Sequence, residues 1–220
     1  MTVFKAIDIQ ALHEFPKTKD LLAVYERDAL KGSEEFFKSL IHQPFSSIGQ
    51  VFKESSTEDI RYILQESISN DLQTDPFYPL WVRDMANLCK TFCEILNNNS
   101  VGFQLGTKRG CRRYHTDNVP MRLLVTYAGK GTQWLPNQAA DRVAFEAGKP
   151  NEAILKDPSA IKYINIWDVA IFRGGHKGIL HRTPDEALDY SSIMLRLDNE
   201  NFWDDIFSEE KQNKNFKIKL

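Results

Sequence analysis

RRYHTDNVPMRLLVTY, residues 112–127, joins a polar stretch containing one histidine and one aspartate to a long apolar run. Both 112–116 and 121–127 have strand character, and Pro120 lies between them, so we expect two strands separated by a turn. Residues two apart in a strand point to the same face of a sheet. His115 and Asp117 have that spacing, so together they can hold one metal ion.

The chain after residue 100 has the pattern of a β domain. Further short segments with strand character lie at 101–105, 161–172 and 191–198, with glycines and prolines between them. Several short strands with such turn residues are typical of a sandwich or a jelly roll. We therefore expect 101–200 to form a double-stranded β-helix of the jelly-roll or cupin-like kind. The polar, alanine-rich stretch 137–160 is expected as an inserted loop and short helix, and 201–220 as a polar tail.

The first hundred residues have the pattern of helices. Apolar residues at helical spacing follow Ser33 and Thr57, and a third such run starts near Trp81 and ends at 97–99, which is Asn-Asn-Asn. The second run is expected to continue to Leu72. Residues 1–100 are therefore predicted as a helical region packed on the β domain, which makes the chain α+β and one compact unit.

A third metal ligand has to come from another strand, and His181 follows the run WDVAIF and the pair Gly174-Gly175. Two histidines and one carboxylate on one face leave coordination positions open, as in non-haem Fe(II) oxygenases. In the last strand, Arg196 alternates with the apolar residues Ile193, Leu195 and Leu197, so it faces the other side. A buried guanidinium needs an anion there, and a dicarboxylate cosubstrate would supply one.

Simpler interpretations of these residues stay open. His115 and Asp117 can be a hydrogen-bonded surface pair with His181 at a strand end, and Arg196 can form an internal salt bridge with Asp168 or Asp198. His176 is interpreted as a turn residue, because its odd spacing from His181 puts it on the opposite face of a strand. Cys89 and Cys93 are interpreted as buried helix residues rather than half of a zinc site.

Composition excludes several classes of protein. With 28 Lys and Arg against 30 Asp and Glu, the formal net charge is −2. The chain therefore lacks the excess of basic residues that would predict binding to nucleic acid. No apolar run is long enough to predict a membrane span, and Asp8 interrupts the place where an export signal would be apolar. Three cysteines do not predict a disulfide framework. We expect a cytoplasmic protein whose partner is a small-molecule or unidentified substrate; the oligomeric state is not predictable.

Three blocks of sequence resemble an uncharacterised bacterial family known as domain of unknown function 1826. They are CRRYHTDNVPMRLLVTYAGKGTQWLP, WDVAIFRGG, and GILHRTP followed by SSIMLRLD, all between about 102 and 198. More distantly, the order of H-x-D, distal histidine and basic residue resembles the Fe(II)/2-oxoglutarate-dependent dioxygenases. That resemblance implies that His115, Asp117 and His181 bind Fe(II) and that Arg196 binds 2-oxoglutarate.

The same resemblance leaves other roles to be assigned. Arg196 lies at the long end of the expected distance after His181, so Arg122 and Arg182 are rival anchors for the cosubstrate. Tyr127 is a further cosubstrate contact, and Trp134 is expected in the substrate pocket, although both aromatics suit a core equally well. The leading hypothesis is an oxygenase that hydroxylates an unknown substrate. The alternatives are a divalent-metal protein that binds zinc or serves metal homeostasis, and a metal-free interaction module.

Overall fold

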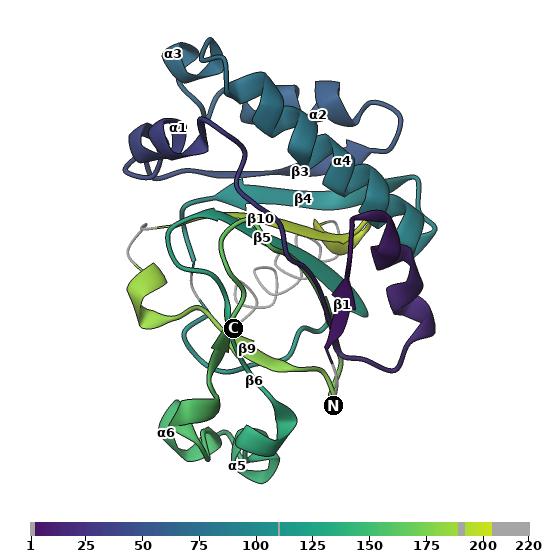
Figure 1. The fold of residues 1–220 in the computed structure, drawn as a ribbon, viewed down its shortest axis with the longest axis vertical. Coiled ribbons are helices and arrows are strands. Elements are labelled where there is room, and N and C mark those ends of the chain that lie inside the picture. Colours follow the sequence, from purple (N-terminus) through teal and green to yellow (C-terminus); the bar gives the residue numbers. More distant parts are fainter. Residues whose placement is uncertain (1–2, 110, 189–191, 204–220) are drawn as a thin grey trace, which may run out of the picture.

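Two β-sheets organise the computed structural model, which describes residues 3–109, 111–188 and 192–203 (Figure 1). Within these ranges the larger sheet has seven strands in the order β1-β2-β8-β5-β10-β4-β3. Only β1 and β2 pair in parallel; all its other neighbours are antiparallel. Its strands are Phe4–Ala6 (β1), Leu22–Tyr25 (β2), Ser46–Phe52 (β3), Ser100–Gly106 (β4), Met121–Ala128 (β5), Val169–Arg173 (β8) and Ile193–Asn199 (β10).

The smaller sheet has the order β7-β6-β9 and is antiparallel. It consists of Gln133–Leu135 (β6), Lys162–Tyr163 (β7) and Leu180–Arg182 (β9). Figure 1 shows β6 and β9 on one side of the larger sheet and helices α1 to α4 on the other. The stretch 137–160, for which the sequence predicts a loop and a short helix, carries four short helical segments: Asn137–Ala139 (η2), Arg142–Glu146 (α5), Asn151–Ile154 (α6) and Pro158–Ala160 (η3).

Alternation along the strands of the larger sheet separates two cores. In β10, Ile193, Leu195 and Leu197 join the main apolar core, which they share with helix α4. Arg196 therefore points to the opposite side, as the sequence predicts. On that side, residues of β2, β5 and β8 pack with Trp134 and Ile179 to form a second apolar cluster. The larger sheet thus packs its main apolar core under the helices, and its other face carries the second apolar cluster together with polar residues such as Arg196.

The helices of the first hundred residues agree with the sequence in position but not always in length. They are Gln10–Lys17 (η1), Ser33–Leu40 (α1), Ser56–Leu64 (α2), Asn70–Gln73 (α3) and Tyr78–Leu96 (α4). The helix expected to reach Leu72 ends at Leu64, and α3 follows as a separate short helix. Helix α4 ends where expected, because Asn97 adopts the left-handed conformation that closes a helix.

Several expectations about strands need correction. Residues 1–100 are not purely helical, since β1, β2 and β3 extend the larger sheet at both edges. No strand forms over 112–116, where only an isolated bridge at His115 is present, and 161–172 holds two strands, β7 and β8, rather than one. The α+β class with a large antiparallel sheet is confirmed. The double-stranded β-helix and the division near residue 100 stay predictions.

No helix among the described residues has both the length and the apolar character needed to cross a bilayer. Most of the expected polar tail, and the first residue of the segment 191–198, lie outside the described residues.

Candidate metal centre

The two histidines of the candidate centre are joined directly through their backbones. His115 donates its amide to the carbonyl of His181 and accepts the amide of His181 in return, both at 3.0 Å. The bridge is isolated at His115, whereas His181 is the middle residue of β9 and also pairs with Trp134 of β6. It brings the imidazole rings to a centroid separation of 4.4 Å. The pairing of two distant segments, rather than one strand's face, therefore creates the first half of the centre.

Asp117 is held in place by a glycine turn that follows β8. The amide of Gly175 donates to the carbonyl of Asp117 at 2.7 Å, and the amide of Gly174 donates to the carbonyl of Pro120 at 3.0 Å. A Cβ on Gly174 would lie 2.0 Å from the carbonyl oxygen of Val119 and 2.5 Å from that of Asp117. Only glycine permits such a close approach, so this turn sets where the Asp117 backbone lies.

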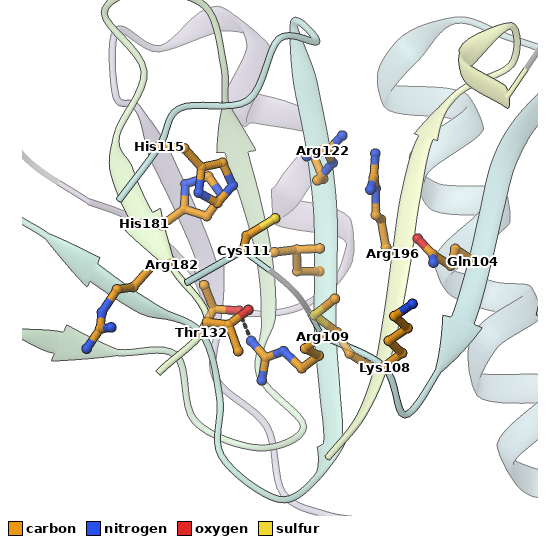
Figure 2. Close-up of a pocket in the computed structure, with 13 residues that line it drawn as sticks. Gln104, Lys108, Arg109, Cys111, His115, Arg122, Thr132, His181, Arg182 and Arg196 are labelled. Carbon is orange, nitrogen blue, oxygen red and sulfur yellow. Dashed lines mark hydrogen bonds between the residues drawn. The ribbon is translucent and has the colours of Figure 1, made fainter. Parts of the chain in front are cut away.

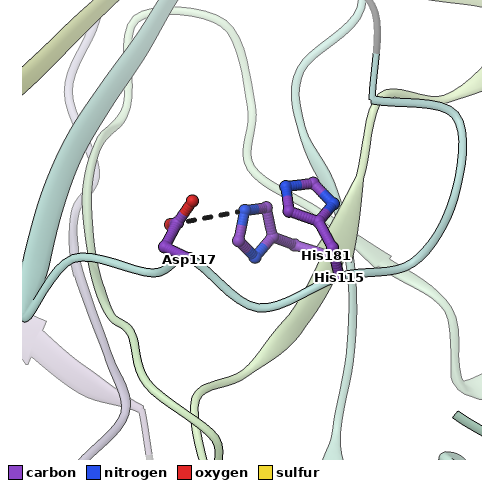
Figure 3. A group of neighbouring side chains, drawn as sticks. All are labelled: His115, Asp117 and His181. Carbon is purple, nitrogen blue, oxygen red and sulfur yellow. Dashed lines mark ion pairs between the residues drawn. The ribbon is translucent and has the colours of Figure 1, made fainter. Parts of the chain in front are cut away.

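These three side chains converge in one place (Figure 3). One ligand atom from each of His115, Asp117 and His181 lies within 4.8 Å of the other two. Asp117 and His181 are 2% and 4% exposed, and His115 is half-buried. Among the described residues, no other group of three histidine, cysteine or acidic side chains meets this condition. The predicted triad is thus brought together.

The hydrogen bonds of the rings determine which nitrogen faces the centre. His115 Nδ1 lies 3.0 Å from the carbonyl oxygen of Arg113, and His181 Nδ1 lies 3.1 Å from that of Ile179. A carbonyl only accepts, so each Nδ1 carries a proton and donates it. In the neutral rings each Nε2 therefore has a free lone pair, and such a backbone partner is the usual support of a metal-bound histidine.

The centre contains two buried hydrogen-bond acceptors that face each other, one on His181 and one on Asp117. Burial lowers the pKa of His181 to about 4, so its ring is neutral at pH 7. Its Nε2 faces Asp117 Oδ2 at 3.5 Å, and that oxygen is buried without a hydrogen-bond partner among the described residues. Two acceptors thus face each other out of contact with water. Such an arrangement is unfavourable unless a cation lies between them.

A cavity of about 150 Å³ adjoins the two histidines (Figure 2). Its wall is basic, and none of the described residues that line it is acidic. The residues that line it are Gln104, Lys108, Arg109, Cys111, His115, Arg122, Leu124, Thr132, His181, Arg182, Thr183, Met194 and Arg196.

Arg122 and Arg196 line the cavity and share one buried carboxylate. Asp198, which is fully buried, accepts from Arg122 Nε at 2.8 Å and from Arg196 Nε at 2.6 Å. Arg122 also donates to Asp117 Oδ1. The internal salt bridge left open for Arg196 therefore exists, with Asp198 as its partner; Asp168 instead bonds to Asn165 and to the Arg27 amide. The terminal nitrogens of Arg196 have no hydrogen-bond acceptor among the described residues.

The remaining predicted site residues are divided between the cavity and the core. Arg182 lines the cavity but pairs with the exposed Asp185 at 3.0 Å. Tyr127 is corrected to a core residue: its ring packs against Trp81 and Trp167 on the helix side of the sheet, and its hydroxyl donates to Asp84 at 2.7 Å. Side chains alternate along β5, and Tyr127 is an odd number of residues from Arg122 and Leu124, so it points to the opposite face of the sheet. Trp134 lies in the second apolar cluster and does not line the cavity, so core packing is its observed role.

Two further residues, neither of them expected as a ligand, complete the site. Arg109 is a buried cavity residue, and Cys111 lines the same cavity, where a hydrogen bond with the His115 side chain lowers the pKa of its thiol. Burial alone would lower the pKa of His115, but this thiol contact and the Arg113 carbonyl raise it above its ordinary value. His176 is exposed and lies 3.2 Å from Glu146, consistent with a turn residue. The basic run KRGCRR before the H-x-D pair was the available signal for this wall.

Comparisons with known proteins identify a family. The model described as "Protein of unknown function (DUF1826)" matches residues 6–198. No curated protein sequence matches the chain.

Solved structures give weaker likenesses. A bsmA homolog from Methylobium petroleophilum PM1 is 11% identical, with a TM-score of 0.42 over 86% of this chain and 92% of that one. The Fe(II)/(alpha)ketoglutarate-dependent dioxygenase TqaL is 12% identical, with a TM-score of 0.45 over 86% and 85%. HygX from Streptomyces hygroscopicus, with nickel and 2-oxoglutarate bound, is 11% identical, with a TM-score of 0.40 over 87% and 86%. At TM-scores below 0.5 the function has to be inferred from the site itself.

Proposed function

Because the chain belongs to the DUF1826 family, whose function is unknown, its chemistry has to come from its site, and we propose that it is a mononuclear non-haem Fe(II)- and 2-oxoglutarate-dependent oxygenase. One observation carries the proposal: the buried Asp117 Oδ2 has no hydrogen-bond partner among the described residues and lies 3.5 Å from Nε2 of His181, whose Nδ1 already faces a carbonyl. A divalent cation there would satisfy both acceptors at once.

The donor set fits iron. His115 and His181 would each bind through Nε2 because Nδ1 is engaged by a carbonyl, and Asp117 would bind through Oδ2 because Arg122 occupies Oδ1. Two nitrogens and one oxygen on one side of an ion leave its other positions open, which suits Fe(II) oxygenases. When bound, Fe(II) with 2-oxoglutarate and dioxygen would supply the oxidation of a substrate C–H bond, which the side chains alone do not supply.

The basic wall would hold the cosubstrate. Arg196 lines the cavity, its terminal nitrogens have no acceptor among the described residues, and a guanidinium fork suits a carboxylate. Asp198 fixes the direction of this fork through Nε, and Phe202 covers the guanidinium with its ring centroid 4.4 Å from Cζ. Arg122 is engaged twice by carboxylates, so we assign it to orienting Asp117 and Asp198 rather than to the cosubstrate. Arg182 is already paired with Asp185.

The test is spectroscopic. Anaerobic Fe(II) and 2-oxoglutarate added to the metal-free protein should give the weak visible charge-transfer band of such a complex. His181→Ala should abolish the band, whereas His176→Ala, which changes an exposed histidine outside the centre, should retain it. A wild-type protein that binds Fe(II) but shows no band and no 2-oxoglutarate binding would refute the proposed cosubstrate.

One observation favours a second candidate, a zinc-binding protein without oxygenase turnover. Cys111 lines the same cavity as the two histidines, and a hydrogen bond with the His115 side chain lowers the pKa of its thiol. Zinc accepts two imidazoles and a carboxylate, and a thiolate is a further ligand that it prefers, although Cys111 Sγ lies outside the group that the three side chains form. Elemental analysis of protein purified without a tag separates the two candidates: stoichiometric zinc that Fe(II) does not displace, and that Cys111→Ser loses, would favour zinc.

A further inference from the structure

Arg109 stands apart from the other cations of the cavity because no carboxylate compensates it. Its side chain lines the cavity although the residue is only 7% exposed. Nη1 donates to the carbonyl of Lys130 at 2.5 Å and Nη2 to the hydroxyl of Thr132 at 3.0 Å. Nε is buried with no partner among the described residues. Neutral acceptors thus hold the guanidinium in position while its charge stays unmatched.

The charges along the wall confirm this difference. Asp198 and Asp117 neutralise Arg122 and Arg196, and Asp185 pairs with Arg182. Lys108 forms no ion pair with a described residue and lines the same cavity. Two positive charges are therefore left over at the part of the wall formed by 108–109. Figure 2 places Arg109 beside Thr132, apart from Arg122 and Arg196.

A buried, unpaired guanidinium is expensive to keep. Burial lowers the pKa of Arg109 to about 10, which reflects the lost hydration of the charged form. Buried charges in proteins are generally paired, because an uncompensated one costs several kcal/mol, and an anionic ligand would supply the missing partner here. Nε of Arg109 is buried without a partner among the described residues, and the exposed Lys108 lines the same cavity, so an oxyanion that enters there meets two cations with no carboxylate partner.

We propose that Arg109, together with Lys108 and Thr132, forms a second anion subsite that binds an oxyanion group of the primary substrate. The assignment to a substrate rests on the proposed oxygenase function; the subsite itself does not. This subsite would accept a small substrate that carries a carboxylate or phosphate group. Arg196 would bind the cosubstrate at one side of the cavity, while Arg109 would orient the substrate from the other.

The subsite is tested by direct binding to the metal-free full-length protein. Inorganic phosphate and acetate are titrated separately by isothermal calorimetry, so that the two titrations distinguish phosphate from carboxylate recognition. Arg109→Gln should weaken binding of the preferred anion about tenfold or more, the loss expected for a charge-assisted hydrogen bond. Arg113→Gln is the matched control, because Arg113 also donates to a backbone carbonyl but is exposed and lies outside the cavity.

Two further measurements separate the subsite from folding and from the cosubstrate. Arg109→Lys, which keeps the positive charge, should recover part of the affinity if Arg109→Gln folds poorly. Arg109→Gln should leave 2-oxoglutarate binding to the metal-loaded protein within about twofold, whereas Arg196→Gln should weaken it. Phosphate binding that depends on Arg109 while 2-oxoglutarate fails to bind would keep the subsite and remove the oxygenase.

The remaining outcomes overturn the proposal. If neither anion binds the wild type, or if Arg109→Gln binds both as tightly as Arg113→Gln does, Arg109 is a structural residue. If Arg109→Gln weakens phosphate and 2-oxoglutarate equally, the cavity holds one anion site rather than two.

Discussion

Gly174→Ala should disrupt the candidate metal centre without replacing any of the three candidate ligands. The added Cβ would lie 2.0 Å from the Val119 carbonyl oxygen and 2.5 Å from that of Asp117, whereas real Cβ contacts stay above 3.0 Å. The segment that carries Asp117 therefore has to retreat by about 1 Å. Metal–ligand distances tolerate only about 0.2 Å, so the Asp117 carboxylate can no longer share an ion with His181.

The expected loss follows from that displacement. Disturbing the groups that orient a ligand typically lowers metal affinity by about 10- to 100-fold, and we expect at least the upper part of this range. The assay is anaerobic competition for Fe(II) against a chromophoric chelator, with circular dichroism to show that the variant is folded. Urea unfolding reports the separate loss of stability.

Gly175→Ala is the matched control. A Cβ there meets nothing within 4 Å, but its φ of +81° is strained for alanine. The variant should be destabilised by about 1 kcal/mol, with its metal affinity within about twofold of wild type. Equal metal affinity in Gly174→Ala and wild type would refute the inference that this turn positions Asp117.

Three other perturbations test the rest of the site. Asp198→Asn removes the carboxylate that two largely buried guanidiniums share, so it should lower the free energy of unfolding in a urea titration by about 3 kcal/mol. The control is Asp185→Asn, at a 70% exposed side chain, which should change that free energy by less than about 1 kcal/mol. Burial holds the pKa of His181 near 4, below its ordinary value of 6.5, so on acidification the unfolded chain takes up the proton first. The free energy of unfolding of the metal-free protein should therefore fall by up to about 3 kcal/mol between pH 6.5 and 4. A His181→Gln variant whose free energy of unfolding falls as much would contradict this. Cys111 is exposed and its hydrogen bond to His115 lowers its pKa, while burial raises the pKa of Cys93 to about 11, so Ellman's reagent should label Cys111 first and Cys111→Ser should lack the fast phase.

The convergence of the three candidate ligands was predictable because residue type and order carry that information. His115, Asp117 and His181 were selected as the residues that could bind metal, and alternation along 193–197 correctly placed Arg196 away from the helices. The reason given for the first pair was wrong, since 112–116 forms no strand. What brings the histidines together is a backbone bridge between distant segments, which has no local signature.

Other features could not be predicted because they depend on which partner a side chain meets. Alternation predicted that Arg196 leaves the apolar face, but the choice of Asp198 over Asp168 required the fold. Tyr127 and Trp134 were equally suited to core and cavity by composition, and the pairing of their strands placed both in apolar clusters. The strand 22–25 was missed because four residues carry too little periodicity to distinguish a strand.

The backbone bridge between His115 and His181 also lets hydrogen exchange report whether the candidate centre holds an ion. One pair of backbone hydrogen bonds joins 115 to 181, and the amide of Thr183 donates to the carbonyl of Cys111 at 2.9 Å, so the contact between the two segments is short and can open locally while the large sheet stays intact. An ion held by both imidazoles would be a second fastening at the same point. The amide protons of these two residues would then exchange with solvent slowly in the loaded protein and quickly in the empty one, which lets occupancy be followed at two backbone positions without any colour or turnover.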